Sequence, residues 1–341
     1  MKSEGSFFQR KIKPLLQHKV FSLTLLYLAM VIIFTVWAAL KNGQWNSFLR
    51  ITIFRNILNS LVISSFLTIG AGCLLIAGHM DLSQAAIGAF GSMVLATAIK
   101  AWGLPWFVGI ILALLLCAVF GAVNAFFVTK LKFPSFIGTL AMASMVKGLM
   151  YLFSSMGNGG VAANINFSNK ATAFLGTGSL GPIPLSVVIM VIFFIVYGLI
   201  MSKTAFGMKV TLMGGSPVAA TLAGINAAGI TTLLFINSAV LGGVAGIFNA
   251  AKLSQGALTA LTTNQFTGIT AAILGGISFG GGAGGMGGAF VGLLILNTFQ
   301  VGMGIVGVNP FWVNVFSGLL LLIALAFDFL SQQRQKKALA H

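Results

Sequence analysis

Charged residues are scarce throughout this chain, and that scarcity limits the folds open to it. Of its 341 residues 6% are charged and 58% are hydrophobic, whereas a soluble domain carries about 25% charged residues. A surface that faces water needs more charged side chains than this chain has. Lipid must therefore be most of its solvent, and inside lipid a chain satisfies its backbone by forming helices. We expect an all-α polytopic membrane protein.

Ten apolar runs are candidate membrane spans, because a helix needs about 20 apolar residues to cross the hydrocarbon core. They cover roughly residues 21–40, 57–77, 82–99, 104–127, 134–153, 183–201, 226–250, 265–279, 285–306 and 310–330. The run at 265–279 is short, so a re-entrant segment is an alternative there.

Lysines and arginines predict the orientation of these spans. With the N-terminus in the cytoplasm, the inside segments hold twelve: Lys2, Arg10, Lys11, Lys13, Lys19, Lys130, Lys132, Lys203, Lys209, Arg334, Lys336 and Lys337. The outside segments hold six: Lys41, Arg50, Arg55, Lys100, Lys170 and Lys252. Cytoplasmic loops are the richer in positive charge, so both termini are expected in the cytoplasm. Lys147 falls within a span, and we expect it in the outer third of its helix with its ammonium reaching the interface.

This topology divides the chain into three parts. Residues 1–20 are expected to form an amphipathic cytoplasmic segment, residues 21–330 a transmembrane domain, and residues 331–341 a basic cytoplasmic tail. The domain has two long connecting segments, 154–182 outside and 202–225 inside. The lysines and arginines that give the net charge of +16 are scattered between the apolar runs. This distribution favours anionic lipid over nucleic acid as the partner.

A short internal echo raises the possibility of a repeat. The tripeptide Gly-Ala-Phe at 88–90 recurs at 288–290, each about ten residues after a glycine, Gly78 or Gly276. Transporter folds often carry repeats with broken helices at corresponding places. Chance is the alternative, because glycine and alanine are common in this chain.

Asp81 is the one carboxylate between Gly5 and Phe327. It precedes an apolar run together with Ser83, so one interpretation is an N-cap worth about 1 kcal/mol. The other is a gating or pathway residue, because a charge at mid-bilayer costs at least about 2.5 kcal/mol and is seldom kept without a function. The two interpretations are compatible.

The remaining polar residues within the spans are hydroxyls and amides. Such groups suit a path for a neutral polar solute such as a sugar, which needs donors and acceptors rather than counter-charges. A single residue of this kind more often makes a hydrogen bond between helices. The pathway candidates are Asn59, Ser64, Asn124, Asn237 and Asn297.

Nothing in the sequence indicates an enzyme or a resident cofactor. The glycine run from 275 to 288 contains no lysine, so it is no phosphate loop. Glycines four residues apart favour close helix packing instead, and Gly275 with Gly276 is a candidate helix break. Cys73 and Cys117 lie inside apolar runs and suggest neither a metal site nor a disulfide.

The segment 202–225 carries the most specific pattern. It predicts a short helix that starts near Ser216, with Pro217 at its first position and Gly224 at its end. A plain connecting loop has no need of a capped helix, whereas a docking site for a cytoplasmic partner does.

At this segment the chain resembles the permease subunit of ribose-type ABC importers. In that family a helix with Gly-Gly, a spacer, Ala-Ala and then Gly-Ile docks on the ATPase subunit, and the matching residues here are Gly214, Gly215, Ala219, Ala220, Gly224 and Ile225. Three more stretches agree in order. Residues 78–83 resemble the family's Gly-Ile-Asp-Leu-Ser, 147–148 its Arg-Gly, and 272–282 its late glycine-rich segment. The resemblance runs from about residue 50 to 330.

Two departures leave the transported solute open. Pro217 stands where many relatives carry Glu, and Gln84-Ala85 replaces the more usual Val-Gly.

The resemblance implies a multi-pass permease in the bacterial inner membrane that moves a ribose-like or other monosaccharide. A second permease copy or a paralogue would complete the path. A separate cytoplasmic ATPase would hold ATP and Mg, and an extracytoplasmic binding protein would deliver the solute. The alternatives are a permease for a nucleoside or other small polar solute, an ion-coupled secondary transporter, and a subunit that transports nothing.

Overall fold

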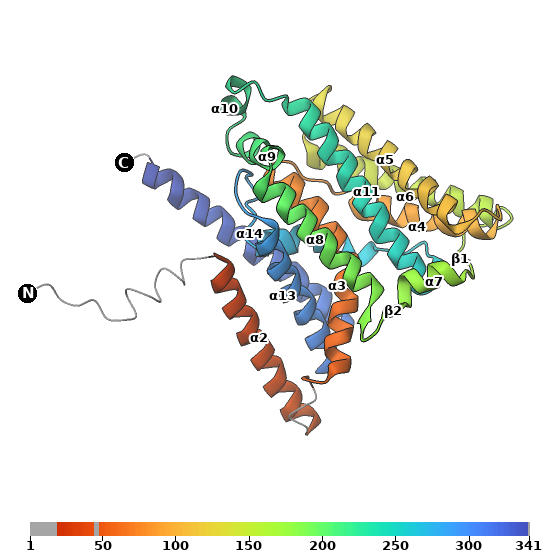
Figure 1. Ribbon diagram of the computed structural model, residues 1–341. Coiled ribbons are helices and arrows are strands. Elements are labelled where there is room, and N and C mark those ends of the chain that lie inside the picture. Colours follow the sequence, from red (N-terminus) through yellow and green to blue (C-terminus); the bar gives the residue numbers. More distant parts are fainter. Residues whose placement is uncertain (1–18, 44–47, 340–341) are drawn as a thin grey trace, which may run out of the picture.

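The computed structural model describes residues 19–43 and 48–339, which form a bundle of α-helices with a few two-residue strands (Figure 1). Eight of the described helices are long and apolar enough to cross a membrane. They are α2 (Lys19–Asn42), α3 (Ile51–Ile76), α5 (Trp106–Thr129), α6 (Ser135–Gly157), α8 (Leu185–Lys203), α11 (Ala227–Leu253), α13 (Met286–Ile305) and α14 (Pro310–Leu339). The expectation of an all-α polytopic membrane protein is confirmed.

Two of the ten predicted spans are shorter than a full crossing. The run at 82–99 is α4 (Gln84–Lys100), a 17-residue helix that is buried along nearly its whole length. The run at 265–279 contains only α12 (Thr267–Leu274), eight residues long. Gly276 follows with a φ of +87°, a backbone conformation that ends a helix and suits glycine. The eighth run is therefore a half-length helix and not a continuous span.

The two long connecting segments carry short elements of their own. The segment 154–182 holds β1 (Ile165–Asn166), α7 (Lys170–Thr177) and most of a hairpin, whose strands are β2 (Ser179–Leu180) and β3 (Ile183–Pro184). The segment 202–225 holds α9 (Ala205–Gly215) and α10 (Pro217–Leu222). Between α11 and α12 lie β4 (Gln255–Gly256) and the 3₁₀ turn η2 (Thr262–Asn264). Most of the predicted amphipathic N-terminal segment, residues 1–18, lies outside the described residues.

The contacts between loops agree with the predicted alternation of sides. β1 pairs with β4, which joins two segments predicted outside. The ammonium of Lys41 donates to the carbonyl of Val306, which joins two further outer ends. In Figure 1, α9 and α10 lie at one end of the bundle, while α7 and β2 lie toward the other. Which end faces the cytoplasm stays a prediction.

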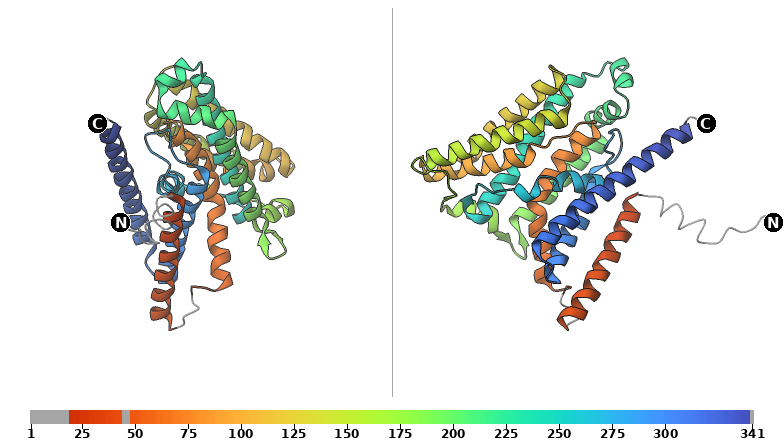
Figure 2. Two further views of the ribbon diagram at one scale, coloured as in Figure 1. Left: turned by 60° about the vertical axis from the view of Figure 1, so that its left-hand side comes forward. Right: turned by 180° about the vertical axis from the view of Figure 1, so that it is seen from behind.

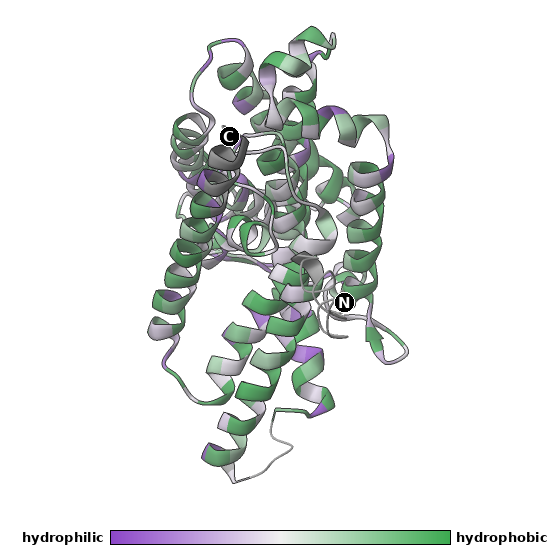
Figure 3. Cartoon of the chain, turned by 90° about the vertical axis from the view of Figure 1, so that its left-hand side faces the viewer, coloured by the Kyte–Doolittle hydropathy of each residue, from purple (hydrophilic) through white to green (hydrophobic). Residues whose placement is uncertain are grey.

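The exterior of the bundle is apolar, as lipid requires. Large apolar side chains are exposed along the outer helices, among them Leu115 of α5, Ile195 of α8 and Leu322 of α14. Figure 3 shows this hydrophobic colour along most of the helices. Figure 2 shows α14 along one side of the bundle, well away from α5 and α6. In lipid such exposure costs nothing, because the tails are as apolar as the side chains.

Glycines on α11 hold the centre of the bundle together. α11 packs on α3, α4 and α5. A Cβ at Gly246 would overlap the carbonyl oxygen of Gly88, and a Cβ at Gly242 would overlap the backbone of Gln84. The backbones of α11 and α4 therefore touch directly. The prediction that glycines four residues apart serve close packing is confirmed here.

Asp81 ties the break between α3 and α4 to two other helices. Its Oδ1 accepts from the backbone N–H and the hydroxyl of Ser83, at 2.8 and 2.6 Å, and its Oδ2 accepts from the hydroxyl of Ser238 on α11 at 2.8 Å. Asn124 of α5 donates to the Ser83 hydroxyl at 2.8 Å. Ser83 itself, at the N-cap position of α4, makes no side-chain cap bond. Asp81 thus supports the start of α4 through a turn and not through a standard cap.

Replacing Gly246 with Ala should destabilise the protein by about 1–3 kcal/mol, because the new methyl group has no space against Gly88. Gly138→Ala on α6 is the matched control, since nothing lies within 4 Å of its Cβ position. Thermal unfolding in detergent measures both. Equal midpoints for the two variants would contradict the packing assignment.

Asp81→Asn should unfold near the wild-type temperature, because the amide oxygen still accepts from Ser83 and the amide nitrogen can donate to the Ser238 oxygen. Asp81→Ala should lower stability by roughly 1–3 kcal/mol, since it strands buried donors. The same unfolding assay compares them. If Asn is as damaging as Ala, the negative charge itself is needed at this site.

Candidate functional site

Three glycine-bearing segments from distant parts of the chain meet at one end of the bundle. They are the end of α3 at Ile76–Gly78, the end of α9 at Gly214–Gly215, and the loop 278–284 that follows α12. The backbone N–H of Gly282 donates to the carbonyl of Ile76 at 2.8 Å. We call this contact the glycine junction. It connects both helix breaks to the segment 202–225.

The glycine junction has no room for side chains. A Cβ at Gly214 would overlap the Ile76 carbonyl and lie 2.7 Å from the Gly282 nitrogen. A Cβ at Gly281 would lie 2.9 Å from the Cα of Gly78. Gly78, Gly281 and Gly282 also have positive φ angles of +79°, +83° and +72°, which glycine adopts at little cost. Sequence reasoning singled out the three segments but did not predict that they touch.

The short helix α10 forms as the sequence predicts. The Ser216 hydroxyl accepts from the Ala219 N–H at 3.2 Å, and Pro217 occupies the first helical position. At the other end Gly224 has a φ of +68°, and the N–H of Ile225 donates to the Ala220 carbonyl at 3.0 Å. Both ends of α10 are therefore capped, which fixes a six-residue helix that could not persist alone.

α10 presents an apolar surface away from the rest of the chain. Val218 is 72% exposed and Leu222 is 84% exposed, while Ala220 between them is buried. Ile225 packs partly against the core. The sequence pattern singled out Ala219 and Ala220 in this helix and not Val218 and Leu222. Their spacing of four residues, which places both on one helix face, was the signal that it missed.

The glycines after α12 serve helix packing. A Cβ at Gly292 of α13 would lie 2.9 Å from the Cα of Gly275. Gly276 then turns the chain out of the helix with its positive φ. α12 and α13 consequently pack closely, one on each side of the break.

The five pathway candidates do not converge on one cavity. Asn124 joins the Asp81 network, Asn237 accepts from the Tyr197 hydroxyl, and Asn297 is buried and donates to the Leu293 carbonyl at 3.1 Å. Ser64 accepts from Asn264 at 3.2 Å, and Asn59 is half-buried on α3. Asn124, Asn237 and Ser64 thus bond to other segments, as the packing interpretation requires, whereas the bond of Asn297 stays within α13. A role in a solute path stays a prediction for all five.

Polar cavities lie elsewhere, around the non-helical segment between α11 and α12. One of about 360 Å³ lies between that segment, α12, α13 and α14, and its polar lining residues are Thr262, Thr263, Thr267, Thr270, Gln300, Asn314 and Ser317. One of about 150 Å³ lies toward α4 and α6, and its polar lining residues are Lys147, Tyr151, Thr259, Thr262 and Gln265. Of these polar residues, only Thr259, Thr262 and Thr263 lie outside the predicted spans. The other polar lining residues lie within them, but nothing in their spacing along the sequence shows that they meet around one segment.

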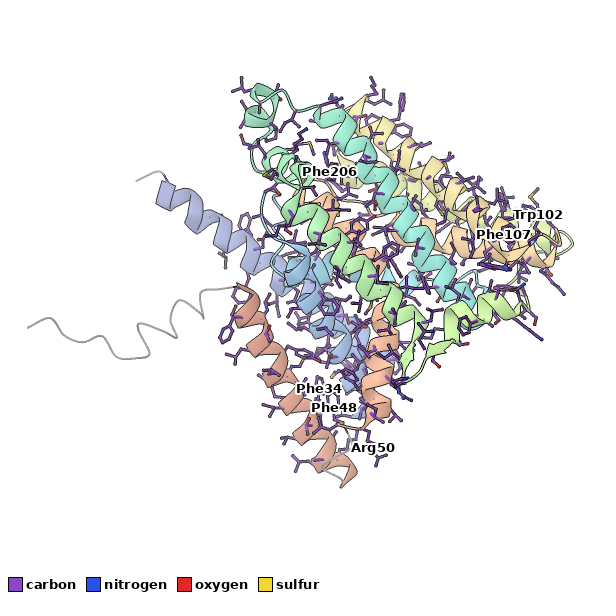
Figure 4. All side chains as sticks on the ribbon, in the orientation of Figure 1. Phe34, Phe48, Arg50, Trp102, Phe107 and Phe206 are labelled. Atoms are coloured by element: carbon purple, nitrogen blue, oxygen red, sulfur yellow. The ribbon has the colours of Figure 1, made fainter. Side chains whose placement is uncertain are left out.

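A third cavity, of about 290 Å³, is mainly apolar. Tyr197, Met201, Phe206 and Leu234 line it together with Asn237. Figure 4 labels Phe206 at the start of α9, close to α8, and labels Trp102 and Phe107 near the opposite end of the bundle. Trp102 and Phe107 are exposed there, as aromatic residues are at a membrane–water interface.

Comparison with known proteins agrees with this architecture. The model of the family described as branched-chain amino acid transport system / permease component matches residues 53–325. Among solved structures no match was found.

Several transport permeases are similar over most of their length. The ribose import permease protein of Bacillus subtilis is 31% identical over 284 residues, 83% of this chain and 86% of that protein. The L-arabinose transport system permease protein of Escherichia coli is 31% identical over 262 residues, 77% of this chain and 78% of that protein. The ribose import permease protein of Escherichia coli is 29% identical over 284 residues, 83% and 87% of the two chains. The chain therefore belongs to the branched-chain amino acid transport system / permease component family, as a multi-pass membrane permease of the ABC importer type and not an enzyme.

Proposed function

We propose that this permease moves a monosaccharide across the cell membrane, powered by ATP hydrolysis on a separate cytoplasmic ATPase. An extracytoplasmic binding protein delivers the solute, and a second permease copy or a paralogue completes the path. ATP and Mg are bound by the ATPase, because this chain has no phosphate-binding loop of the Gly-Lys-Ser/Thr type. The termini and α10 then face the cytoplasm.

The observation that carries the coupling part of the proposal is the exposed apolar face of α10 above the glycine junction. Val218 and Leu222 have no partner surface among residues 19–43 and 48–339, and a capped helix with an apolar face suits a groove on another protein. Through Gly214 and Gly215, α9 connects α10 to both helix breaks. Docking of the ATPase would therefore act where the helices are interrupted.

The solute class is supported by the relatives and by the polar lining. The relatives named above are ribose and L-arabinose permeases. The two cavities beside η2 offer hydroxyls and amides, with Lys147 as the one charged group. Neutral polyhydroxylated solutes need such donors and acceptors. A nucleoside or another small polar solute meets the same requirement and remains the second candidate.

Ion-coupled transport has less support. Such carriers keep ionisable relays along the path, and Asp81 is the one carboxylate between Gly5 and Phe327. Its two oxygens are already occupied by Ser83 and Ser238. It lines none of the cavities described above.

Leu222→Asp should uncouple transport from ATP hydrolysis. The side chain is 84% exposed, so the variant should insert and fold normally, but a charge on a docking face should weaken ATPase binding by roughly tenfold or more. Leu222→Met is the matched control and should bind the ATPase almost as wild type does. Co-purification and ATPase stimulation measure the effect. If the Leu222→Asp permease stimulates the ATPase fully, α10 is not part of the docking site.

Proteoliposomes test the function itself. With the ATPase, the binding protein and internal ATP, we expect uptake of labelled D-ribose or L-arabinose that a protonophore does not inhibit. A nucleoside is the third solute to be offered. Uptake that needs a proton gradient and proceeds without the ATPase would refute the proposal in favour of a secondary transporter.

A further inference from the structure

The segment between α11 and α12 passes through the membrane region without forming an α-helix, and its one helical element is the 3₁₀ turn η2. Gly256 lies against α4, where its Cβ would be 3.1 Å from the Cα of Met93. Leu261 reaches the first turns of α4, 2.7 Å from the Cβ position of Gly88. The chain therefore runs along α4 from its outer half toward its start before α12 begins. We call residues 257–266 the re-entrant segment because they enter the bundle from its outer end. α12 then continues toward the opposite end.

Contacts with α3 place the re-entrant segment near mid-membrane. Asn264 donates to the hydroxyl of Ser64 at 3.2 Å, and Ser64 stands twelve residues (76 − 64) before the end of α3 at Ile76. Twelve residues span about 18 Å of helix, roughly half of a hydrocarbon core about 30 Å thick.

The re-entrant segment exposes polar groups at this depth. Thr259, Thr262 and Thr263 are exposed, and apart from the single 3₁₀ turn η2 the backbone of residues 257–266 forms no helix. Non-helical backbone at membrane depth is tolerated only where it is buried in protein or lines a water-filled cavity. This face cannot border lipid, so within the membrane it borders water or another protein surface.

Lys147 points to the same conclusion from α6. It lies twelve residues after Ser135 and ten before Gly157, and so near the middle of α6. The expectation that it lies in the outer third is wrong, because α6 extends beyond residue 153. The nearer end is about 15 Å away, farther than a lysine side chain extends. Lys147 is exposed and lines the smaller cavity together with Gln265.

Polar groups of α13 and α14 complete the surface on the other side of η2. Gln300 donates to the Ser317 hydroxyl at 3.3 Å, and the exposed Asn314 lies beside them. The cavity there, at about 360 Å³, falls within the range of about 300–1,000 Å³ that is usual for small-molecule sites.

We propose that the re-entrant segment, with Lys147 on one flank and Gln300 and Asn314 on the other, is the surface that contacts the solute during transport. Threonine hydroxyls and side-chain amides both donate and accept hydrogen bonds, which matches the alternating needs of sugar hydroxyls. Lys147 supplies donors only, so it pairs with hydroxyl or ring oxygens. This assignment rests on the proposed function, and it replaces the scattered asparagines of the spans with one continuous surface.

Cysteine accessibility in the assembled complex tests whether this surface is wet. Thr263→Cys and Asn314→Cys should react with a membrane-impermeant anionic thiol reagent at least tenfold faster than Leu115→Cys, a lipid-facing control in the middle of α5. Wild type, whose Cys73 and Cys117 are buried, gives the background. Reaction of Thr263→Cys as slow as that of Leu115→Cys would overturn the proposal.

Uptake then tests solute contact. Thr263→Val and Lys147→Met should each reduce D-ribose or L-arabinose uptake about tenfold, through loss of a hydrogen bond made to solute, while Lys147→Arg restores part of it. Leu115→Ala should transport as wild type does. Wild-type uptake by both variants would show a wet surface that does not touch the solute and would refute the proposal. If the wild-type complex moves no sugar at all, the proposed function fails, whereas the labelling result still stands.

Discussion

The backbone hydrogen bond from Gly282 to Ile76 is the contact on which the rest of this architecture depends. The end of a helix leaves backbone groups without intrahelical partners, and other segments must supply them where the end is packed in protein. Here two breaks lie against each other and against the end of α9, so one interrupted helix supplies hydrogen-bond partners for the other. Glycines at all three positions let the backbones approach. The interrupted helices are therefore held in place by one another.

The Asp81 network solves the same problem at the first break. Asp81 accepts the N–H of Ser83, which α4 leaves without a partner, and bonds to Ser238 on α11. The two oxygens of the Asp81 side chain reach both partners at once and so join the start of α4 to α11.

The sequence predicted the parts of this molecule that depend on local rules. Hydrophobic runs predicted the long helices. Ser216, Pro217 and Gly224 predicted α10 with both of its caps. The prediction failed where the depth of a residue in the membrane or a contact between distant segments determines the structure. The run at 265–279 is apolar enough to look like a span, yet Gly276 ends its helix after eight residues. Lys147 was placed too near the interface because the end of α6 could not be located from composition alone. Ile76, Gly214 and Gly282 meet although they lie 68 to 206 positions apart in the chain, and no pattern along one sequence predicts such a contact.

The absence of side chains at the glycine junction determines how movement passes through it. Packed side chains can absorb a small displacement by changing rotamer, but Gly214, Gly281 and Gly282 have none to change. A shift of α9 by an ångström must therefore either carry the ends of α3 and α12 with it or separate the three backbones altogether. The three segments therefore move together as one rigid unit until their contact breaks.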